Sequence, residues 1–120
     1  MYPITIERMK TRPQFLAAAK AYSCPRGALL VQGRARDDAD PTIRIGFTAT
    51  KRIGNAVARN RSKRRLREAA RALAPLHALP GCDYVFIARS GALGRPWGRL
   101  LDDMKAALIR LAADIGARDP

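Results

Sequence analysis

The segment from Lys51 to Arg71, KRIGNAVARNRSKRRLREAAR, constrains the fold of this chain more than any other part of its sequence. It holds nine basic residues and a single acid, Glu68. Gly54 and Asn55 introduce a helix that begins near Ala56, and on a helical wheel one side is apolar while the other is basic. One face of this helix must therefore pack on a core while the other stays in solvent. The apolar stripe comprises Ala58, Ser62, Leu66, Ala69 and Leu73, and the opposite side carries Asn60, Arg61, Arg64, Arg67 and Arg71.

The basic face of this helix is unfavourable for stability alone. Like charges at i and i+4 repel by a few tenths of a kcal/mol per pair, and solvated helix faces usually mix both signs. The whole chain has 23 Lys and Arg against 10 Asp and Glu, a formal charge of +13, and a polyanion would relieve the resulting self-repulsion. Most of these cations are Arg, whose guanidinium group binds phosphate bidentately and stacks on bases. The sequence therefore favours contact with a nucleic acid over a merely solvated face.

The remaining pattern predicts an α+β fold in a single domain over residues 1–120, because a chain of 120 residues holds one core. An acidic turn with Asp37, Asp38 and Asp40 separates two predicted strands, which we expect to form an antiparallel hairpin. Helices are expected to cover one face of a small mixed sheet, as an α/β sandwich. The expected order is a basic arm at 1–10, a helix at 11–21, a break at 22–27, strands at 28–32 and 42–49, the basic helix ended by Pro75, Pro80 and Gly81, a buried strand at 84–88, and an amphipathic helix marked by Leu101, Met104, Leu108, Leu111 and Ile115.

Other functional classes find little support in the sequence. Cys24 and Cys82 lack CxxC or Cys/His spacing and the only histidine is His77, so a structural zinc site has too few ligands. Both cysteines are expected to be small buried or half-buried hydrophobes in a reducing cytosol. No stretch approaches the ~20 apolar residues of a membrane span, so we expect a cytoplasmic protein. No catalytic set can be assembled around His77, which we expect in a loop.

The order of residues in the basic segment is more specific than its charge. Lys51-Arg52-Ile53-Gly54-Asn55-Ala56-Val57, followed by Arg59-Asn60-Arg61, Lys63-Arg64 and Arg67-Glu68, resembles the Arg-Asn-Arg signature of the ribonuclease P protein family. The stretches Arg44–Ala49 and Asp83–Arg89, and Phe15 after a basic N-terminal stretch, are similar to the same family, whereas the tail after Gly91 is less diagnostic. The resemblance implies a small α/β sandwich with a left-handed βαβ crossover, although general base rates favour a right-handed one.

The resemblance also implies partners and site residues. Arg12 and Phe15 would contact the single-stranded 5′ leader of precursor tRNA. The residue pattern alone, in contrast, favours a core position for Phe15. Ala18 and Ala19 stand where family members often have further aromatic residues. Mg²⁺ would be bound mainly by the RNA, and whether the protein itself holds a metal is unknown. No catalytic residue is expected in the protein. We expect one protein monomer in a 1:1 complex with the RNA. The catalytic RNA subunit would be contacted by Lys51, Arg52, Asn55, Arg59, Asn60, Arg61, Lys63, Arg64 and Arg67.

Several alternatives stay open at this stage. The chain can be a generic basic RNA-binding or ribosomal protein, or a DNA-binding module that reads the major groove with its basic helix. It can also be a protein nuclease that holds Mg²⁺ on the acidic turn, although turn formation explains those residues more simply. Arg65 and Arg71 match the signature less firmly and are equally well explained as solvent-exposed charge. The sequence does not decide whether Tyr22, Tyr84 and Trp97 contact RNA or fill the core.

Overall fold

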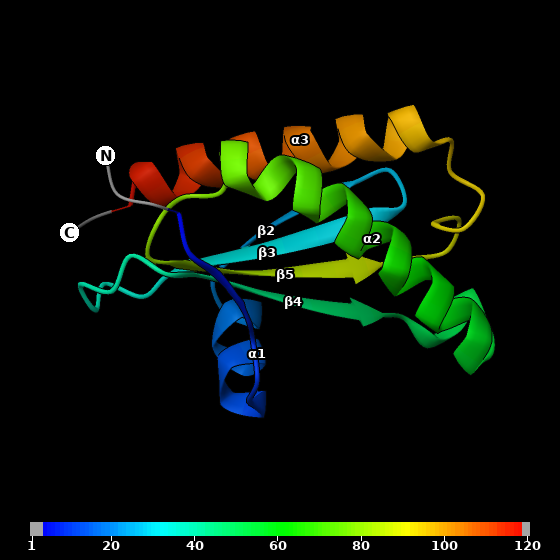
Figure 1. The fold of residues 1–120 in the computed structure, drawn as a ribbon, viewed down its shortest axis with the longest axis horizontal. Helices are drawn as coiled ribbons and strands as arrows, with labels where there is room; N and C mark the ends of the chain where they lie inside the picture. The colour runs from blue at the N-terminus through cyan, green and yellow to red at the C-terminus, as the bar shows by residue number, and fades with distance from the viewer. Residues whose placement is uncertain (1–3, 119–120) are drawn as a thin grey trace.

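The computed structural model describes residues 4–118, in which a five-stranded mixed sheet lies between helices (Figure 1). This confirms the α+β class. The basic arm expected at 1–10 lies partly outside the described residues, and its residues 6–8 form the first strand. In chain order the elements are β1 (Ile6–Arg8), α1 (Arg12–Ala19), β2 (Tyr22–Arg26), β3 (Leu29–Ala35), β4 (Ile43–Ala49), a 3-10 turn η1 (Lys51–Ile53), α2 (Ala56–His77), β5 (Cys82–Ala88) and α3 (Trp97–Gly116).

The central strand of the sheet is β5, which confirms the buried strand predicted from its continuous apolar run. The strand order is β1-β4-β5-β3-β2. Strand β4 runs parallel to both β1 and β5, whereas β3 is antiparallel to β5 and to β2. The connection from β4 through α2 to β5 is therefore a parallel crossover, and the left-handed sense implied by the family resemblance stays a prediction.

The predicted hairpin between the strands on either side of the acidic turn is wrong. Strand β5 inserts between β3 and β4 and pairs with both, and its continuous apolar run suits a central strand whose two faces are both covered. The first helix does end before residues 22–27, as predicted, but this stretch is not irregular: Tyr22–Arg26 forms β2. The turn to the next strand lies at Gly27, at φ 51°, and Ala28. Pro25 hid β2 from the sequence pattern, and an edge strand tolerates a proline.

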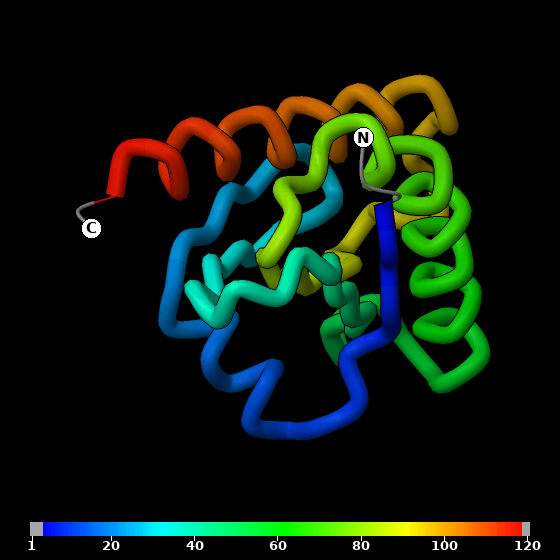
Figure 2. The backbone as a smooth tube through the Cα atoms, turned by 60° about the vertical axis from the view of Figure 1, so that its left-hand side comes forward, coloured from blue at the N-terminus to red at the C-terminus, as the bar shows by residue number. Residues whose placement is uncertain are grey.

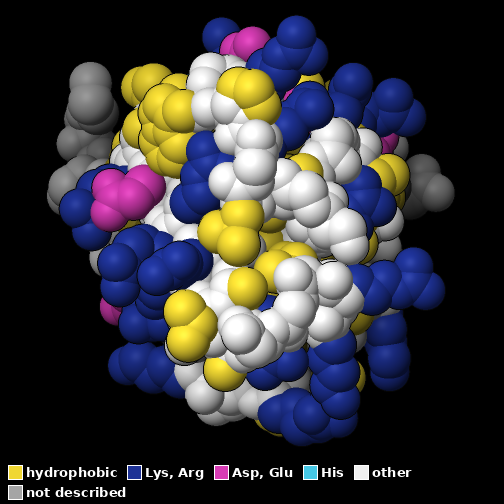
Figure 3. Space-filling model, turned by 90° about the vertical axis from the view of Figure 1, so that its right-hand side faces the viewer, with side chains coloured by type: hydrophobic (Ala, Val, Ile, Leu, Met, Phe, Trp, Pro, Cys, Tyr) yellow, Lys and Arg dark blue, Asp and Glu magenta, His cyan; other side chains and the backbone are white. Residues whose placement is uncertain are grey.

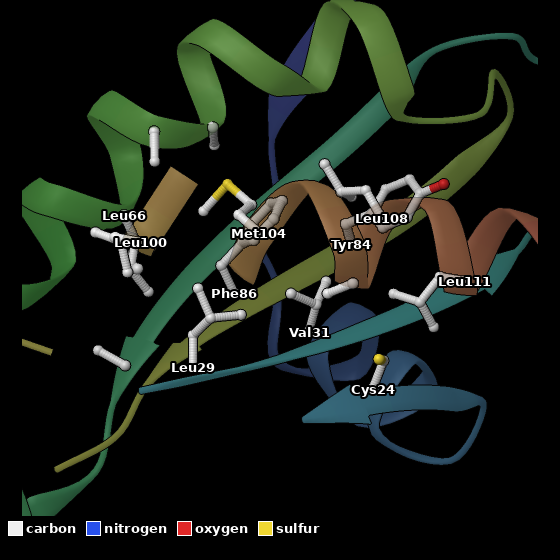
Figure 4. Close-up of a cluster of buried hydrophobic side chains, with 14 of the residues drawn as sticks. Cys24, Leu29, Val31, Leu66, Tyr84, Phe86, Leu100, Met104, Leu108 and Leu111 are labelled. Carbon is white, nitrogen blue, oxygen red and sulfur yellow. The ribbon is translucent and has the colours of Figure 1, made fainter. Parts of the chain in front are cut away.

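Helices cover both faces of the sheet, not one as expected (Figures 1 and 2). Helices α2 and α3 lie on one face, where Leu66, Leu100 and Met104 meet the sheet residues Tyr84 and Phe86 in the main core (Figure 4). The short helix α1 lies on the opposite face and forms a smaller cluster. This second cluster contains Met9, Ala18 and Val85, with Phe15 and Ile87 packed against it.

Helix α2 begins where the sequence predicts it to begin. The Asn55 side-chain oxygen accepts a hydrogen bond from the Ala58 amide at 2.9 Å, which makes Asn55 the N-cap. The helix continues through Pro75 to His77, so the expectations that Pro75 ends it and that His77 lies in a loop are wrong. A proline near a helix C-terminus removes one hydrogen bond but leaves the following residues free to stay helical.

Gly46 allows α1 to approach the sheet, and we expect Gly46→Ala to destabilise the protein. A Cβ atom built at this position would lie 2.5 Å from the Phe15 ring. Overpacking of this kind costs about 1–3 kcal/mol, which would appear as a lower denaturant midpoint. Gly98→Ala is the matched control, because nothing lies within 4 Å of its added Cβ. A Gly46→Ala protein as stable as the Gly98→Ala protein would contradict this packing.

Candidate RNA-binding surface

The outer face of α2 carries the basic residues, as predicted. Ser62, Leu66 and Ala69 of the inner stripe are fully buried, and this burial turns the opposite side of the helix to solvent. Within residues 4–118, none of the ion pairs involves a Lys or Arg from the segment 51–71. On this face Asn60, Arg61, Arg64 and Arg71 are exposed, and Arg59, Lys63 and Arg67 are half-buried.

The entry to α2 adds two cations to this face. Lys51 and Arg52 lie in η1 and are exposed, and Gly54 at φ 138° lets the chain turn into the helix. The unpaired amides at a helix N-terminus also attract anions. Asn55 has a definite structural task here, because its side-chain oxygen is already engaged in capping.

A cation that the sequence analysis did not single out, Arg89, joins this end of the molecule. It follows β5 and lines a surface hollow together with Lys51 and Arg52. One nitrogen of its guanidinium, Nη2, donates to the Gly27 carbonyl at 3.1 Å, while its buried Nε has no hydrogen-bond partner in the described residues. In the sequence, Arg89 ends the stretch DYVFIAR, which is similar to the family, and this position could have marked it as a candidate. Figure 3 views this end of the molecule, where Lys and Arg side chains greatly outnumber Asp and Glu.

Phe15 and Arg12 lie on the other face of the sheet, on α1. The Phe15 ring packs over Gly46 and against Met9 and Val85, and it is half-buried. It is therefore partly a core residue, as the residue pattern alone favoured, and partly accessible beside the exposed Arg12. The α2 face and the α1 face are separated by the sheet, so the predicted site residues form two surfaces.

The acidic turn is organised by Arg36. The guanidinium of Arg36 donates to the carboxylates of Asp83 at 2.8 Å and Asp38 at 3.0 Å, and to the Thr42 carbonyl at 2.6 Å. Burial opposes the charge of Arg36, but its bonds to Asp83 and Asp38 raise its pKa above the usual value. Asp83 is fully buried, so this pair lies in the interior of the protein. The turn is held by internal ion pairs and hydrogen bonds.

The remaining carboxylates of the turn are also engaged. Asp40 accepts a hydrogen bond from the Thr42 amide at 2.9 Å, and Asp37 pairs with Arg118 at 2.6 Å. The bond from Arg36 lowers the pKa of Asp38, and the bond from Thr42 lowers the pKa of Asp40. A lowered carboxyl pKa contributes stability at neutral pH that is lost as the pH falls through the folded-state value. These contacts support the structural explanation of the turn.

Arg65 is neither a solvent-exposed charge nor a free cation of the basic face. Its guanidinium donates to the backbone carbonyls of Ala92, Leu93 and Arg95, the last at 2.7 Å. It therefore ties α2 to the loop that precedes α3. Its weaker match to the family signature separates it from its neighbour Arg64, but the sequence does not reveal these contacts, because they arise from the tertiary position of the loop.

The structure also places the aromatic residues that the sequence left undecided, together with the two cysteines. Tyr84 is fully buried, and its hydroxyl accepts a hydrogen bond from the Leu79 amide, while the half-buried Tyr22 packs against the main core. Cys24 and Cys82 are free and buried, as predicted, and burial raises the pKa of Cys82. Trp97, in contrast, is substantially exposed.

The fold and these surfaces define a class: a basic α+β protein with one cationic helix face, whose charge suits a nucleic-acid partner. The family model described as Ribonuclease P matches residues 5–112. A Ribonuclease P protein component of Caulobacter vibrioides (strain NA1000 / CB15N) is 62% identical over 114 residues, covering 95% of this chain and 76% of that protein. The chain therefore belongs to the ribonuclease P protein family, and is a subunit of a tRNA-processing ribonucleoprotein, an endoribonuclease holoenzyme that acts on precursor tRNA.

Further relatives and solved structures agree with this membership. A Ribonuclease P protein component of Ruegeria pomeroyi is 50% identical over 110 residues, covering 90% of this chain and 88% of that protein. The RNase P protein of Staphylococcus aureus has a TM-score of 0.70 at 27% identity, covering 88% of this chain and 94% of that one. The protein from Thermotoga maritima, with a TM-score of 0.71 at 23% identity and coverage of 86% and 96%, shares the fold. No helix within residues 4–118 has the length and hydropathy to cross a membrane.

We expect Arg36→Met to destabilise the protein strongly, because it leaves the buried Asp83 carboxylate without its closest partner. Breaking a buried pair on one side costs about 3–5 kcal/mol, which urea denaturation would measure. Arg110→Met is the control, since Arg110 forms an exposed pair with Asp114 and such pairs contribute little. Equal stability of the two variants would contradict the role given to Arg36.

Proposed function

We propose that the outer face of α2 binds the catalytic RNA of ribonuclease P, and that the α1 face of the sheet binds the 5′ leader of precursor tRNA. The observation that carries this proposal is the basic face of α2, whose cations form no ion pairs within residues 4–118 although six aspartates pair with arginines elsewhere. The residues proposed to contact the catalytic RNA are Lys51, Arg52, Asn55, Arg59, Asn60, Arg61, Lys63, Arg64 and Arg67.

The chemistry of the α2 face suits an RNA surface. Exposed guanidinium groups such as those of Arg61 and Arg64 can bind phosphates in pairs of hydrogen bonds, and the exposed Asn60 can hydrogen-bond a base edge, a sugar or a phosphate. Because these cations are not neutralised by acidic residues of the protein, their contacts with phosphates release counterions from the RNA. The affinity for RNA is therefore expected to rise as the salt concentration falls. Asn55 contributes by fixing the start of the helix, whatever it contacts directly.

The leader is proposed to lie beside α1, against Arg12 and Phe15. The partly accessible ring of Phe15 can stack on an unpaired base, and such stacking is tolerant of sequence. The exposed Arg12 lies close by in the chain and can neutralise a leader phosphate. Phe15 is the one aromatic residue of α1, so α1 offers a single ring to the leader where family members often have more.

The phosphodiester chemistry is proposed to belong to the RNA partner, with Mg²⁺ bound mainly by that RNA. Within the described residues no three His, Cys, Asp or Glu side chains form a metal-binding group, and the carboxylates of the acidic turn are engaged by Arg36, Arg118 and Thr42, so they do not fit a resident metal. The protein's part is to screen repulsion between two RNAs and to hold the leader. We further propose that the chain acts as a single domain, one monomer per RNA, in the cytoplasm.

We expect Arg64→Ala to weaken binding of the catalytic RNA and to reduce its salt dependence. Loss of one phosphate contact lowers the slope of log affinity against log salt by about 0.7 to 0.9. Filter binding over a range of salt concentrations measures both effects, and cleavage of precursor tRNA at low Mg²⁺ should slow in parallel.

Arg110→Ala is the matched control for this experiment, because it removes the same charge from the exposed side of α3. Equal losses in both variants would mean that only net charge matters, and the assignment of the α2 face would then be wrong. Unchanged low-Mg²⁺ cleavage on addition of the native protein would overturn the proposed function itself.

Phe15→Leu tests the leader surface, because leucine keeps most of the packing over Gly46 but loses the aromatic face. We expect weaker binding of precursor tRNA with an unchanged affinity for mature tRNA, since only the precursor has a leader. Binding of both RNAs to the reconstituted holoenzyme measures this ratio. Leu16→Ala, at an exposed position of the same helix, is the control and should leave the ratio unchanged.

The same measurement separates the alternative function. A generic RNA-binding or ribosomal-type protein would bind precursor and mature tRNA equally in every variant. If Phe15→Leu leaves the precursor-to-mature ratio intact in a stable protein, leader binding by this surface is wrong.

A further inference from the structure

Trp97 lies in an unusual position for a tryptophan. It is the only tryptophan of the chain and the first residue of α3, and it is 43% exposed although the main core lies directly beneath this helix. Burying such a large ring would stabilise the fold more than this position does. The exposed ring therefore suggests a task outside the fold.

Arg65 holds the ring of Trp97 next to the basic helix. The Arg65 Cζ atom lies 5.7 Å from the centroid of the indole ring, in cation–π contact. The same guanidinium donates to the backbone carbonyls of Ala92, Leu93 and Arg95 in the loop before α3. The loop is secured further because Arg95 pairs with Asp103 at 2.9 Å. These contacts tie the start of α3, and with it the ring, to α2.

The surroundings of the ring are cationic. Arg61 precedes Arg65 by one helical turn, so both lie on the same side of α2, and Arg61 is exposed. An exposed aromatic ring held against a guanidinium, next to a basic helix face, offers a surface on which an unpaired base stacks while nearby cations neutralise its phosphates. An apolar protein segment would instead have to desolvate these arginines.

We propose that Trp97 stacks on an unpaired base of the RNA that α2 binds, so that the RNA interface continues from α2 across the 92–95 loop to the start of α3. This inference rests on the proposed function of α2 as an RNA-binding face. Arg65 acts as a positioning residue, which fixes the loop and the ring and does not contact the RNA itself. The protein then carries two stacking rings on separate surfaces, Phe15 for the leader and Trp97 for the catalytic RNA.

The fluorescence of the native protein gives a direct test, because Trp97 is the sole tryptophan. Titration with the ribonuclease P RNA of the same organism should quench the emission, and the quenching should saturate at the RNA concentrations at which filter binding saturates. An emission spectrum and intensity unchanged at saturating RNA would overturn the proposal without any substitution in the protein.

Substitutions test whether the ring contributes affinity. Trp97→Ala should weaken RNA binding by roughly fivefold to a hundredfold, the range measured for loss of one base–aromatic stack, and should leave the salt slope unchanged because no phosphate contact is lost. Trp97→Phe keeps a stacking face and should lose less affinity than Trp97→Ala. Ile109→Ala, which shortens another exposed apolar side chain of α3, is the control and should bind like the native protein.

The outcomes separate this proposal from the proposed function. If Arg64→Ala weakens binding but folded Trp97→Ala binds like the native protein, the stacking role is wrong and the RNA-binding role of α2 stands. If neither variant affects binding, both are wrong. Thermal unfolding of each variant shows whether it is folded, and should Trp97→Ala fail to fold, equal affinity of Trp97→Phe and the native protein together with absent quenching would overturn the proposal.

Discussion

The rest of the structure depends on the packing of α2 across β4 and β5. Because these strands are parallel neighbours, the chain must return over the sheet between them, and α2 makes that return. Its inner stripe, with Leu66 and Ala69 fully buried, leaves no freedom in how the helix is rotated. The cations are therefore turned outward by the same contacts that close the core. Because β4 and β5 are parallel, their carboxyl ends lie at the same end of the sheet. Lys51 and Arg89, which follow these two strands, therefore line the same hollow.

The structure divides its charges between two uses. The aspartates at positions 37, 38, 40, 83, 103 and 114 pair with arginines outside the segment 51–71. The acids thus neutralise cations around the acidic turn and along α3, and the excess positive charge is concentrated on α2 and its entry. Segregated charge of this kind produces a stronger local field than the same net charge spread evenly. The formal charge of +13 understates how strongly this one face attracts a polyanion.

Local pattern in the sequence was sufficient to predict α1, β4, α2 and α3, which repeat apolar residues at a helical or strand spacing, and β5, which is a continuous apolar run. Strand pairing was not predictable in the same way. The acidic turn suggested a hairpin, yet its residues fold around Arg36 while β5, from 40 residues further along the chain, takes the place between β3 and β4. Pairing is decided by which strands can be buried on both sides, and that depends on the whole sheet. The edge strand β2, with Pro25, had no pattern to detect.

The candidate site residues also include some that the sequence predicts and some that only the tertiary structure reveals. The order Arg59-Asn60-Arg61 and the one-sign face were visible in the sequence, because they depend on residue identity and helical spacing alone. The structural role of Arg65 was not visible, since its weaker match to the signature does not say which groups its side chain contacts. Arg65 meets the carbonyls of the loop before α3, and Trp97 is exposed because that loop is held there. Arg65 of the basic segment therefore has a structural role, and it brings Trp97 next to α2. Neither the charge of the segment nor its motif reveals this neighbour.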